Sequence, residues 1–443
     1  MSETEPNILV TPPGPRAREI IEREKLYASP SLTKEYLFVA DHGDGCFVWD
    51  PDGNCFLDFH AGIAVGTLGH NHARITQVIA EQAERLLHMC GSDFYHAPYG
   101  ELCERLSLLA PGETPKRVFL SNSGTGAVEC AIKLARFATG RPYTLACYGG
   151  FHGRTLGALV HTGSNPLQRK GQVLPAGTFH FPYPDVYRGK GVDALDELPE
   201  TVFRMVSPKE FAAVIIEPIQ GEGGYIVPPP WYMQRLRRLC DEHGILLIAD
   251  EVQTGIGRTG KMFCMEHYGV EADITALAKG IANGLPLGAT IARAELMEKW
   301  EPGMQGSTGG GNPVACRVAL IVLDELERGV MTNCQQVGSF LQGEFRALMA
   351  RHPSLGDVRG KGLMIGLEIV RNRATKEEAK DIRDTIIQRA FERGLLLLHC
   401  GKSVIRISPP LILSEREARI GVDILDRVLT EVEQEFHVRL PQW

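Results

Sequence analysis

From residue 116 to about residue 295, short β-rich runs alternate with segments of helical periodicity, and this alternation is the strongest constraint on the fold. The strand candidates are RVFL (117–120), YTLACY (143–148), AAVIIEP (212–218), ILLIAD (245–250) and DITALA (273–278). Helical segments such as 127–138 and 231–244 lie between them. Because these strands are apolar on both faces, the pattern predicts an α/β domain with a mainly parallel, covered central sheet.

The two ends of the chain follow a different pattern. Near the N-terminus, a short helix is expected in PRAREIIEREKLYA, followed by a hairpin in CFVWDPDGNCFLDF (46–59) around a Pro-Asp-Gly-Asn turn. Beyond about residue 335 the sequence predicts helix GSFLQGEFRALMARHP, strand LMIGLEIV, helix KEEAKDIRDTIIQRAFERG, strands LLLLHC and VIRISP, and a terminal helix. We therefore expect a large domain over 66–330 and a smaller α+β domain over 331–443, to which residues 1–65 contribute.

The composition narrows the class of protein. The 443 residues are 44% hydrophobic and 23% charged, with a net charge of −7. This mixture supports a large core, and it lacks the basic excess that nucleic-acid binding needs. The N-terminus has no apolar signal core, and no apolar run reaches membrane-spanning length. We expect a cytoplasmic protein that binds neither nucleic acid nor membrane.

Cysteine usage indicates the redox compartment. The chain has 11 cysteines, an odd number, and no two have the C-x-x-C spacing. Several lie inside apolar runs, which is typical of buried thiols in a reducing compartment. The pattern favours neither a disulfide framework nor a zinc site, and no metal is expected. A reactive cysteine nucleophile is an alternative without a supporting local signature.

The first strand candidate leads into SNSGTGAVE, which is followed by a helix. Ser123, Gly124 and Thr125 place hydroxyl and free N–H groups at a helix N-terminus, an arrangement that suits a phosphate. A plain Ser/Thr helix cap is the alternative interpretation.

Two other strand candidates end in a charged residue. Asp250 closes ILLIAD, where a partly buried carboxylate needs a cationic partner. Lys279 follows DITALA, where partial desolvation favours the neutral, nucleophilic amine. Alternatively, the aspartate is a helix cap or surface acid, and the lysine is a simple ion-pair partner.

Together, these three features match the needs of a pyridoxal phosphate (PLP) enzyme. A lysine amine forms a Schiff base with the cofactor aldehyde, and an acid keeps the pyridine nitrogen protonated. A helix N-terminus holds the phosphate. In an open α/β sheet such ligands bind at the carboxyl ends of the strands, where all three features are expected.

A second glycine-rich segment needs a separate explanation. GIGRTGKM (255–262) nearly matches the P-loop pattern of nucleotide-binding proteins. Met262 stands where a magnesium-binding hydroxyl is required, and the segment does not directly follow the strand. A nucleotide-binding function is therefore disfavoured.

Several motifs in order resemble the class III, or ω-amino-acid, aminotransferases of PLP fold type I. The resemblance runs from GDGCFVWDPDGNCFLDFHAGIAVGTLGH to IRISPPLILSE, nearly the whole chain. It implies that Ser123, Gly124 and Thr125 contact the cofactor phosphate. YGGFHGRT (148–155) resembles the ring-stacking motif, which implies Phe151 on one face of the pyridine with His152 beside it.

Other matches imply further site residues. IIEPIQGEGG (215–224) matches the family segment with Glu217, Gln220 and Glu222, of which Glu217 belongs to the cofactor site. In several members the second glutamate, here Glu222, pairs with the arginine that binds the substrate α-carboxylate, here Arg406. That pair acts as a switch between substrates with and without a carboxylate at this position. Arg154 matches an arginine that some members use for a distal carboxylate.

The remaining matches concern the ring and the assembly. ADEVQTGIGRTG implies Asp250 at the ring nitrogen, Val252 on the other ring face and Gln253 near the phenolic oxygen. GSTGGGNP (306–313) resembles the loop whose threonine, here Thr308, reaches the phosphate bound in the neighbouring subunit. The resemblance therefore implies a homodimer with shared sites, and leaves open a higher oligomer.

Two positions depart from the family pattern. Gly126 stands where the family usually has glutamate after SGT, which removes a carboxylate near the phosphate and loosens the first helical turn. Gly309 replaces an aromatic residue in the 306–313 loop.

We expect an aminotransferase that moves an amino group from an ω-amino or basic amino acid to 2-oxoglutarate, with Lys279 as Schiff-base lysine and general acid–base. Candidate donors are 4-aminobutyrate, ornithine and N-acetylornithine. The alternative with the same fold is an amino-acid racemase or epimerase, which the segments GPRAREIIERE and HFPYPDVYRG resemble. A PLP-binding protein without turnover is a third hypothesis.

Overall fold

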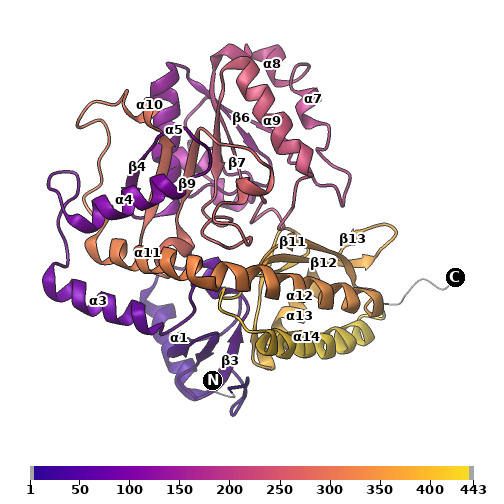
Figure 1. Cartoon of the computed structure of the whole chain (residues 1–443). Helices are drawn as coiled ribbons and strands as arrows, with labels where there is room; N and C mark the ends of the chain where they lie inside the picture. Colours follow the sequence, from indigo (N-terminus) through magenta and orange to yellow (C-terminus); the bar gives the residue numbers. More distant parts are fainter. Residues whose placement is uncertain (1–3, 439–443) are drawn as a thin grey trace. The chain divides into compact units, whose positions relative to one another are not determined.

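The computed structural model describes residues 4–438 and divides into two compact units (Figure 1). The sheet unit comprises Arg74–Met331, and the terminal unit comprises the residues up to Ala73 together with those from Thr332 onward. The sequence analysis placed the corresponding boundaries after residues 65 and 330, and the expected domain roles stay a prediction.

A seven-stranded sheet forms the centre of the sheet unit. Its strands are β4 (Lys116–Ser121), β5 (Tyr143–Cys147), β6 (Thr178–Phe181), β7 (Phe211–Ile216), β8 (Leu246–Asp250), β9 (Ile274–Leu277) and β10 (Gly288–Arg293). The strand order is β4-β10-β9-β8-β7-β5-β6. Strand β10 is antiparallel to both of its neighbours, and the other pairs are parallel. The predicted α/β fold with a mainly parallel sheet is confirmed.

The sequence analysis missed β6 and β10. Strand β10 was not predicted, because glycines and a proline dominate the residues before it. It nevertheless lies inside the sheet, with Gly288 opposite Ser121 and Ala289 opposite Leu277. The small residues that suggested a loop instead allow this strand to fit between two others.

The sheet unit also contains several helices. They are α3 (Ala73–Arg85), α4 (Ala97–Leu109), α5 (Gly124–Thr139), α6 (Leu156–Leu159), α7 (Ala194–Glu197), α8 (Val202–Met205), α9 (Pro230–His243), α10 (Ala294–Met297) and α11 (Pro313–Glu325), with short 3-10 turns between some of them. Helix α5 packs on β4, β7, β8, β9 and β10 (Figure 1). Its alanines allow this close packing, because Ala127, Ala131 and Ala135 are fully buried in the same cluster as Ile215 and Ile248.

The terminal unit is a smaller α+β structure. One sheet has the order β1-β2-β3-β14, with β1 (His42–Asp44), β2 (Phe47–Trp49), β3 (Cys55–Asp58) and β14 (Leu395–Leu396). The other has the order β11-β12-β16-β15, with β11 (Leu355–Lys361), β12 (Met364–Asn372), β15 (Leu398–Cys400), β16 (Val404–Ile407) and the short β13 (Glu377–Glu378) on β12. The helices are α1 (Pro15–Tyr27), α2 (Ala61–Ala64), α12 (Met331–Arg351), α13 (Lys380–Glu392) and α14 (Glu415–Glu435). The expected hairpin is confirmed as β2–β3.

Two expectations for this unit were wrong in detail. LLLLHC is not one strand: Leu395–Leu396 pairs with β3, and Leu398–Cys400 pairs with β16. A change of sheet within an apolar run leaves no mark in the sequence. The helix expected from residue 376 begins at Lys380, because Glu377–Glu378 pairs with β12 as β13.

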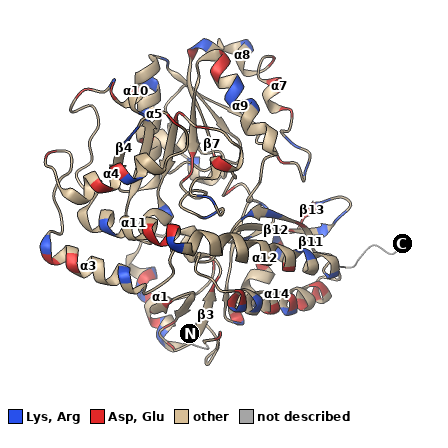
Figure 2. Ribbon diagram, viewed as in Figure 1, with Lys and Arg blue, Asp and Glu red and all other residues tan. Residues whose placement is uncertain are grey.

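Surface charge and cysteines agree with the composition. Figure 2 shows acidic and basic residues interspersed along α3 and α14.

All eleven cysteines are free, and only Cys90 and Cys103 are not fully buried. Within residues 4–438, no helix is both long enough and apolar enough to span a bilayer.

Candidate cofactor site

The predicted site residues follow strands that end at one edge of the sheet. Strands β8 and β9 are parallel neighbours, with Asp250 opposite Ala276. Lys279 follows three residues after Ala276, so the acid and the lysine leave the sheet on adjacent strands. Strand β4 runs in the same direction and leads into α5. The sheet topology therefore brings the phosphate-loop candidate, the acid and the lysine to the same edge.

The start of α5 is capped by Ser123. The Ser123 Oγ accepts the N–H of Gly126 at 3.1 Å, and the Ser123 carbonyl accepts the N–H of Ala127 at 3.0 Å. The cap interpretation is therefore correct, and it does not exclude a phosphate. Within residues 4–438, the N–H groups of Gly124 and Thr125 have no protein acceptor, so the first turn keeps donors for an anion.

Two glycines allow the backbone to close around this turn. A Cβ on Gly124 would lie 2.8 Å from Val252 Cγ1, and a Cβ on Gly288 would lie 2.3 Å from the Ser123 carbonyl oxygen. Gly126, which stands where the family usually has glutamate, is also closely packed: a Cβ there would lie 3.1 Å from the Cβ of Ser121. The segment is a close-packed cradle that only glycine fits without displacement at positions 124 and 288.

Asp250 is buried and has a histidine partner that the sequence did not reveal. His152 Nδ1 lies 2.7 Å from Asp250 Oδ2, and the Val252 N–H donates to Oδ1 at 3.1 Å. Burial alone lowers the imidazole pKa, but the hydrogen bond and the charge of Asp250 outweigh it, so the pKa of His152 is raised. The buried Nε2 of His152 has no protein partner in residues 4–438.

Glu217 holds the segment that carries Phe151 and His152. Its carboxylate accepts the N–H of Phe151 at 3.0 Å and the N–H of Gly221 at 2.8 Å. Burial raises the pKa of Glu217 to about 7, opposed by the charge of His152. Glu217 therefore fixes two loops at the sheet edge and titrates near neutral pH.

Phe151 and Arg154 lie next to each other. Phe151 is half-buried, and the exposed Arg154 guanidinium lies 5.9 Å from its ring centre. This distance suits a cation–π contact. The structure thus places the expected carboxylate-binding arginine beside the expected stacking ring.

The two glutamines bond to neighbouring loops. The Tyr225 hydroxyl donates to Gln253 Oε1 at 2.6 Å, which leaves the Gln253 amide N–H groups as donors. Gln220 Nε2 donates to the Tyr148 carbonyl at 2.9 Å. The Gln253 amide can therefore donate a hydrogen bond to a phenolic oxygen, as the sequence analysis expected.

Lys279 has an unusual backbone conformation. Its φ is 46°, in the left-handed region that non-glycine residues rarely adopt, and its side chain is half-buried. Such strain persists only where the surroundings enforce it, and it gathers at functional sites. The strained backbone supports a functional interpretation of this lysine.

Three further predicted residues lie on other segments of the chain. Thr308 is exposed, and its neighbour Ser307 donates to Asn122 Oδ1 at 2.9 Å. Glu222 is half-buried in the sheet unit, and Arg406 is buried on β16 of the terminal unit. Because the last two belong to different units, their pairing stays a prediction.

One buried acid beside the site was missed. Glu251 is 1% exposed, and it accepts from the N–H groups of Cys264 and Met265 and from the Thr254 hydroxyl. An acid directly after a buried strand was the available signal, which the adjacent Asp250 obscured. The segment 255–262, which nearly matches a P-loop in sequence, forms buried turns that lead into a 3-10 helix at Cys264–His267. A nucleotide-binding P-loop instead joins a strand directly to a helix, so the structure does not support a nucleotide site here.

The arrangement fits pyridoxal phosphate on structural grounds. Positions 124 and 288 form a cradle that a Cβ would fill, the first turn of α5 offers N–H donors, and a buried carboxylate has a fixed orientation. Lys279 supplies an amine at the same edge of the sheet. These are the groups that the phosphate, pyridine nitrogen and aldehyde of this cofactor require.

Comparison with known proteins shows which family the chain resembles over most of its length. A family model described as aminotransferase class-III matches residues 28–429. The 4-aminobutyrate aminotransferase GabT of Escherichia coli (strain K12) is 39% identical over 94% of this chain and 99% of its own length. The alanine/serine racemase of Pyrococcus horikoshii is 38% identical over 96% and 93%. The structure of an amine transaminase from an uncultivated Pseudomonas species, in its PLP-bound (internal aldimine) form, has a TM-score of 0.84 and 34% identity over 91% and 98%.

Proposed function

The chain belongs to the class III aminotransferases, a family of pyridoxal-phosphate-dependent transferases, and on this premise we propose that it moves the amino group of an ω-amino or basic amino acid to 2-oxoglutarate. The proposed donors are 4-aminobutyrate, ornithine and N-acetylornithine. The observation that carries this proposal is the placement of Asp250 and Lys279 at the ends of adjacent parallel strands.

The residues divide the chemical work. Bound pyridoxal phosphate supplies an electron sink for the bonds broken at the substrate carbon. Asp250, oriented by His152 and the Val252 N–H, would accept a hydrogen bond from the protonated pyridine nitrogen. The Lys279 amine would hold the cofactor, and it would take and return the substrate proton as general acid–base. Gln253 would donate a hydrogen bond to the phenolic oxygen of the cofactor, and Phe151 would cover one face of its ring.

Substrate recognition and assembly are part of the same proposal. Arg154 and Arg406 bind substrate carboxylates, since a guanidinium grips a carboxylate with two hydrogen bonds. Glu222 adapts the site to donors that lack a carboxylate at that position. A homodimer in which Thr308 serves the neighbouring subunit completes the site. We place the enzyme in the cytoplasm, because its eleven free cysteines suit a reducing compartment.

A racemase of the same fold is the second candidate. It is favoured by relatives such as the alanine/serine racemase, whose identity of 38% is close to the 39% of the aminotransferase GabT. Racemization returns the proton to the other face of the same carbon, so it needs an acid–base group on each face. Glutamate at position 222 suits the carboxylate switch better than this second role.

A donor panel separates the two reactions. Purified holoenzyme is incubated with each proposed donor and 2-oxoglutarate, and glutamate is measured. In parallel, L-ornithine and L-lysine are incubated without any oxo acid and analysed by chiral chromatography. We expect glutamate from at least one donor and no D-enantiomer. D-Enantiomer formed without oxo acid, together with no glutamate in the panel, would overturn the proposal.

A further inference from the structure

Two hydroxyls and a carboxylate form a short hydrogen-bonded chain beside the start of α5. Thr155 Oγ1 lies 2.8 Å from Thr125 Oγ1 and 2.5 Å from Glu129 Oε1. Thr125 and Glu129 are one turn apart on α5, whereas Thr155 follows the loop that carries Phe151. This relay, made of Thr125, Thr155 and Glu129, joins the proposed phosphate loop to the proposed ring-stacking loop.

The chemistry of the relay fixes the direction of its hydrogen bonds. An ionised carboxylate only accepts hydrogen bonds, so Glu129 takes the single proton of the Thr155 hydroxyl. Thr155 Oγ1 can then only accept from its other neighbour, and the proton between the two threonines comes from Thr125. The hydroxyl proton of Thr125 is therefore directed away from any ligand at the helix start.

Ser123 is in the opposite situation. Its Oγ accepts the N–H of Gly126, so its own hydroxyl proton is left to donate. A phosphate dianion accepts hydrogen bonds and offers no donor. The two hydroxyls of the SGT segment thus differ in what they offer to an anion, although they look equivalent in the sequence.

The backbone packs closely against both ends of the relay, whereas Thr155 between them is exposed. Glu129 Oε1 also accepts the Ala158 N–H at 3.1 Å, which anchors the carboxylate. A Cβ on Gly157 would lie 2.3 Å from Glu129 Oε2, and a Cβ on Gly153 would lie 2.2 Å from Thr125 Oγ1. Both ends of the relay are held by close-packed backbone.

We propose that Glu129 and Thr155 are positioning residues, which together direct the hydroxyl proton of Thr125 toward Thr155 and away from the phosphate. The cofactor phosphate then takes its hydroxyl donor from Ser123 and its main-chain donors from the N–H groups of Gly124 and Thr125. This inference rests on the proposed placement of the phosphate at the start of α5. It goes further by separating two hydroxyls that the resemblance treats alike.

A double-mutant cycle on cofactor affinity tests the direction of the relay. Apoenzyme of the wild type, Thr125→Val, Thr155→Val and the double variant is titrated with pyridoxal phosphate, and the dissociation constant is measured by absorbance and by equilibrium dialysis. Valine keeps the shape of threonine and removes only the hydroxyl. We expect Thr125→Val alone to change the dissociation constant less than about threefold, because its proton does not reach the phosphate.

Removal of the Thr125 hydroxyl should weaken cofactor binding only in a variant in which the relay is broken. In Thr155→Val the Thr125 proton has lost its acceptor and turns to the phosphate. Removing the Thr125 hydroxyl in that background should weaken binding about tenfold or more, as loss of a hydrogen bond to a charged group does. A tenfold loss in Thr125→Val alone, or the same factor in both backgrounds, would overturn the proposal.

Two controls separate this outcome from other failures. Pyridoxal, which lacks the phosphate, should show no coupling between positions 125 and 155. Ser123→Ala should weaken pyridoxal phosphate binding about tenfold or more with a much smaller effect on pyridoxal. If Ser123→Ala leaves the affinity for both ligands unchanged, the phosphate does not bind at the start of α5 and the underlying placement fails. If that variant behaves as expected and the cycle shows no coupling, only the relay is refuted.

Discussion

His152 donates its Nδ1–H to Asp250 over 2.7 Å, and the two side chains are 1% and 3% exposed. A buried carboxylate at the end of an apolar strand is costly without such a partner. The imidazole and the Val252 N–H bind different oxygens of Asp250, which fixes the plane of the carboxylate. Asp250, which we propose binds the cofactor ring nitrogen, is thus oriented by the protein itself.

His152→Ala should destabilise the apoprotein by about 3 kcal/mol, because removal of one partner leaves a buried charge uncompensated. Urea unfolding of the apoprotein measures this loss. His161→Ala is the matched control: His161 is also buried, but it bonds to Thr144 and to the Gly157 carbonyl, and burial lowers its pKa to about 3. Equal losses in the two variants would show that packing, not charge, explains the effect of His152.

The sequence predicted that Asp250 and Lys279 lie at the same edge of the sheet, because Asp250 ends one apolar strand, Lys279 follows another, and the carboxyl ends of parallel strands share an edge. The partner of Asp250 could not be predicted in the same way. His152 precedes it by 98 residues, and their contact depends on how the loop after β5 folds back, which Glu217 fixes by binding the Phe151 N–H. Periodicity describes single elements and carries no information about such closure.

The same limit explains the errors in the fold. Long apolar runs such as that of β8 were predicted well, because burial on both faces requires them. Strand β10 was missed, since its glycine and alanines match a loop, and its place between β4 and β9 follows from close packing with Ser121 and Ser123. Hydrogen-bond direction in the relay was equally beyond the sequence, because it depends on Thr155 lying between Thr125 and Glu129.

Lys279→Ala should abolish transamination while the protein still binds pyridoxal phosphate without a covalent link. The phosphate and ring contacts remain in this variant, whereas the amine that attaches the cofactor and moves the proton is gone. Borohydride reduction followed by intact-mass spectrometry measures the covalent link, and gel filtration measures retained cofactor. The exposed Lys261→Ala is the control and should behave as wild type. Substantial activity in Lys279→Ala would contradict the assigned role.

Gly288→Ala should disturb the cofactor site from the adjacent strand. Its Cβ would lie 2.3 Å from the Ser123 carbonyl oxygen, so β10 or the start of α5 must move. Overpacking of this kind costs about 1–3 kcal/mol, and we expect cofactor affinity to fall with it. Gly100→Ala in α4 meets no atom within 4 Å and should instead stabilise by about 0.5–1 kcal/mol. Cofactor titration and urea unfolding compare the two, and unchanged affinity in Gly288→Ala would show that the cradle tolerates a side chain.

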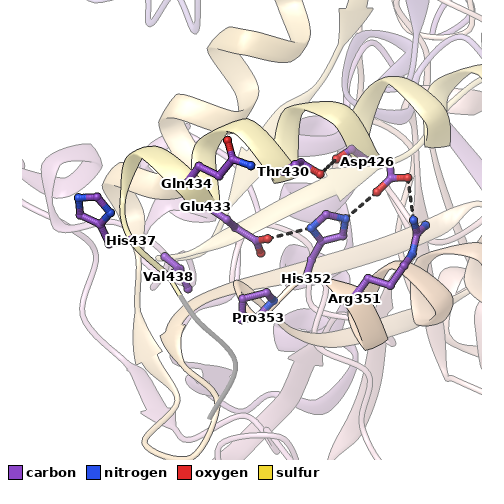
Figure 3. Close-up of a pocket in the computed structure, with 9 residues that line it drawn as sticks. All are labelled: Arg351, His352, Pro353, Asp426, Thr430, Glu433, Gln434, His437 and Val438. Carbon is purple, nitrogen blue, oxygen red and sulfur yellow. Dashed lines mark hydrogen bonds and ion pairs between the residues drawn. The ribbon is translucent and has the colours of Figure 1, made fainter. Parts of the chain in front are cut away.

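The terminal unit contains another buried histidine that contacts carboxylates, His352, which lies between two of them. His352 lies in a pocket of about 620 Å³, with Nδ1 2.9 Å from Glu433 and Nε2 2.6 Å from Asp426, both on α14 (Figure 3). Arg351 also bonds to Asp426, at 3.0 Å. Burial alone lowers the pKa of His352, but the hydrogen bonds to Glu433 and Asp426 outweigh it, so this pKa is raised. The imidazole of His352 joins the end of α12 to α14.

His352→Gln should therefore destabilise the protein in a pH-dependent way. Because folding raises the pKa of His352, protonation of this histidine stabilises the folded state. This stabilisation is complete at pH values below the unfolded-state pKa of about 6.5, and it is lost as the pH rises through the folded-state pKa. We expect a loss of about 2 kcal/mol near pH 6, which shrinks at higher pH. Urea unfolding of both proteins at several pH values between 5.5 and 9 measures the difference. His437→Gln, an exposed histidine of the same pocket, should show no such trend. A difference for His352→Gln that stays constant with pH would mean that the neutral imidazole makes these contacts equally well.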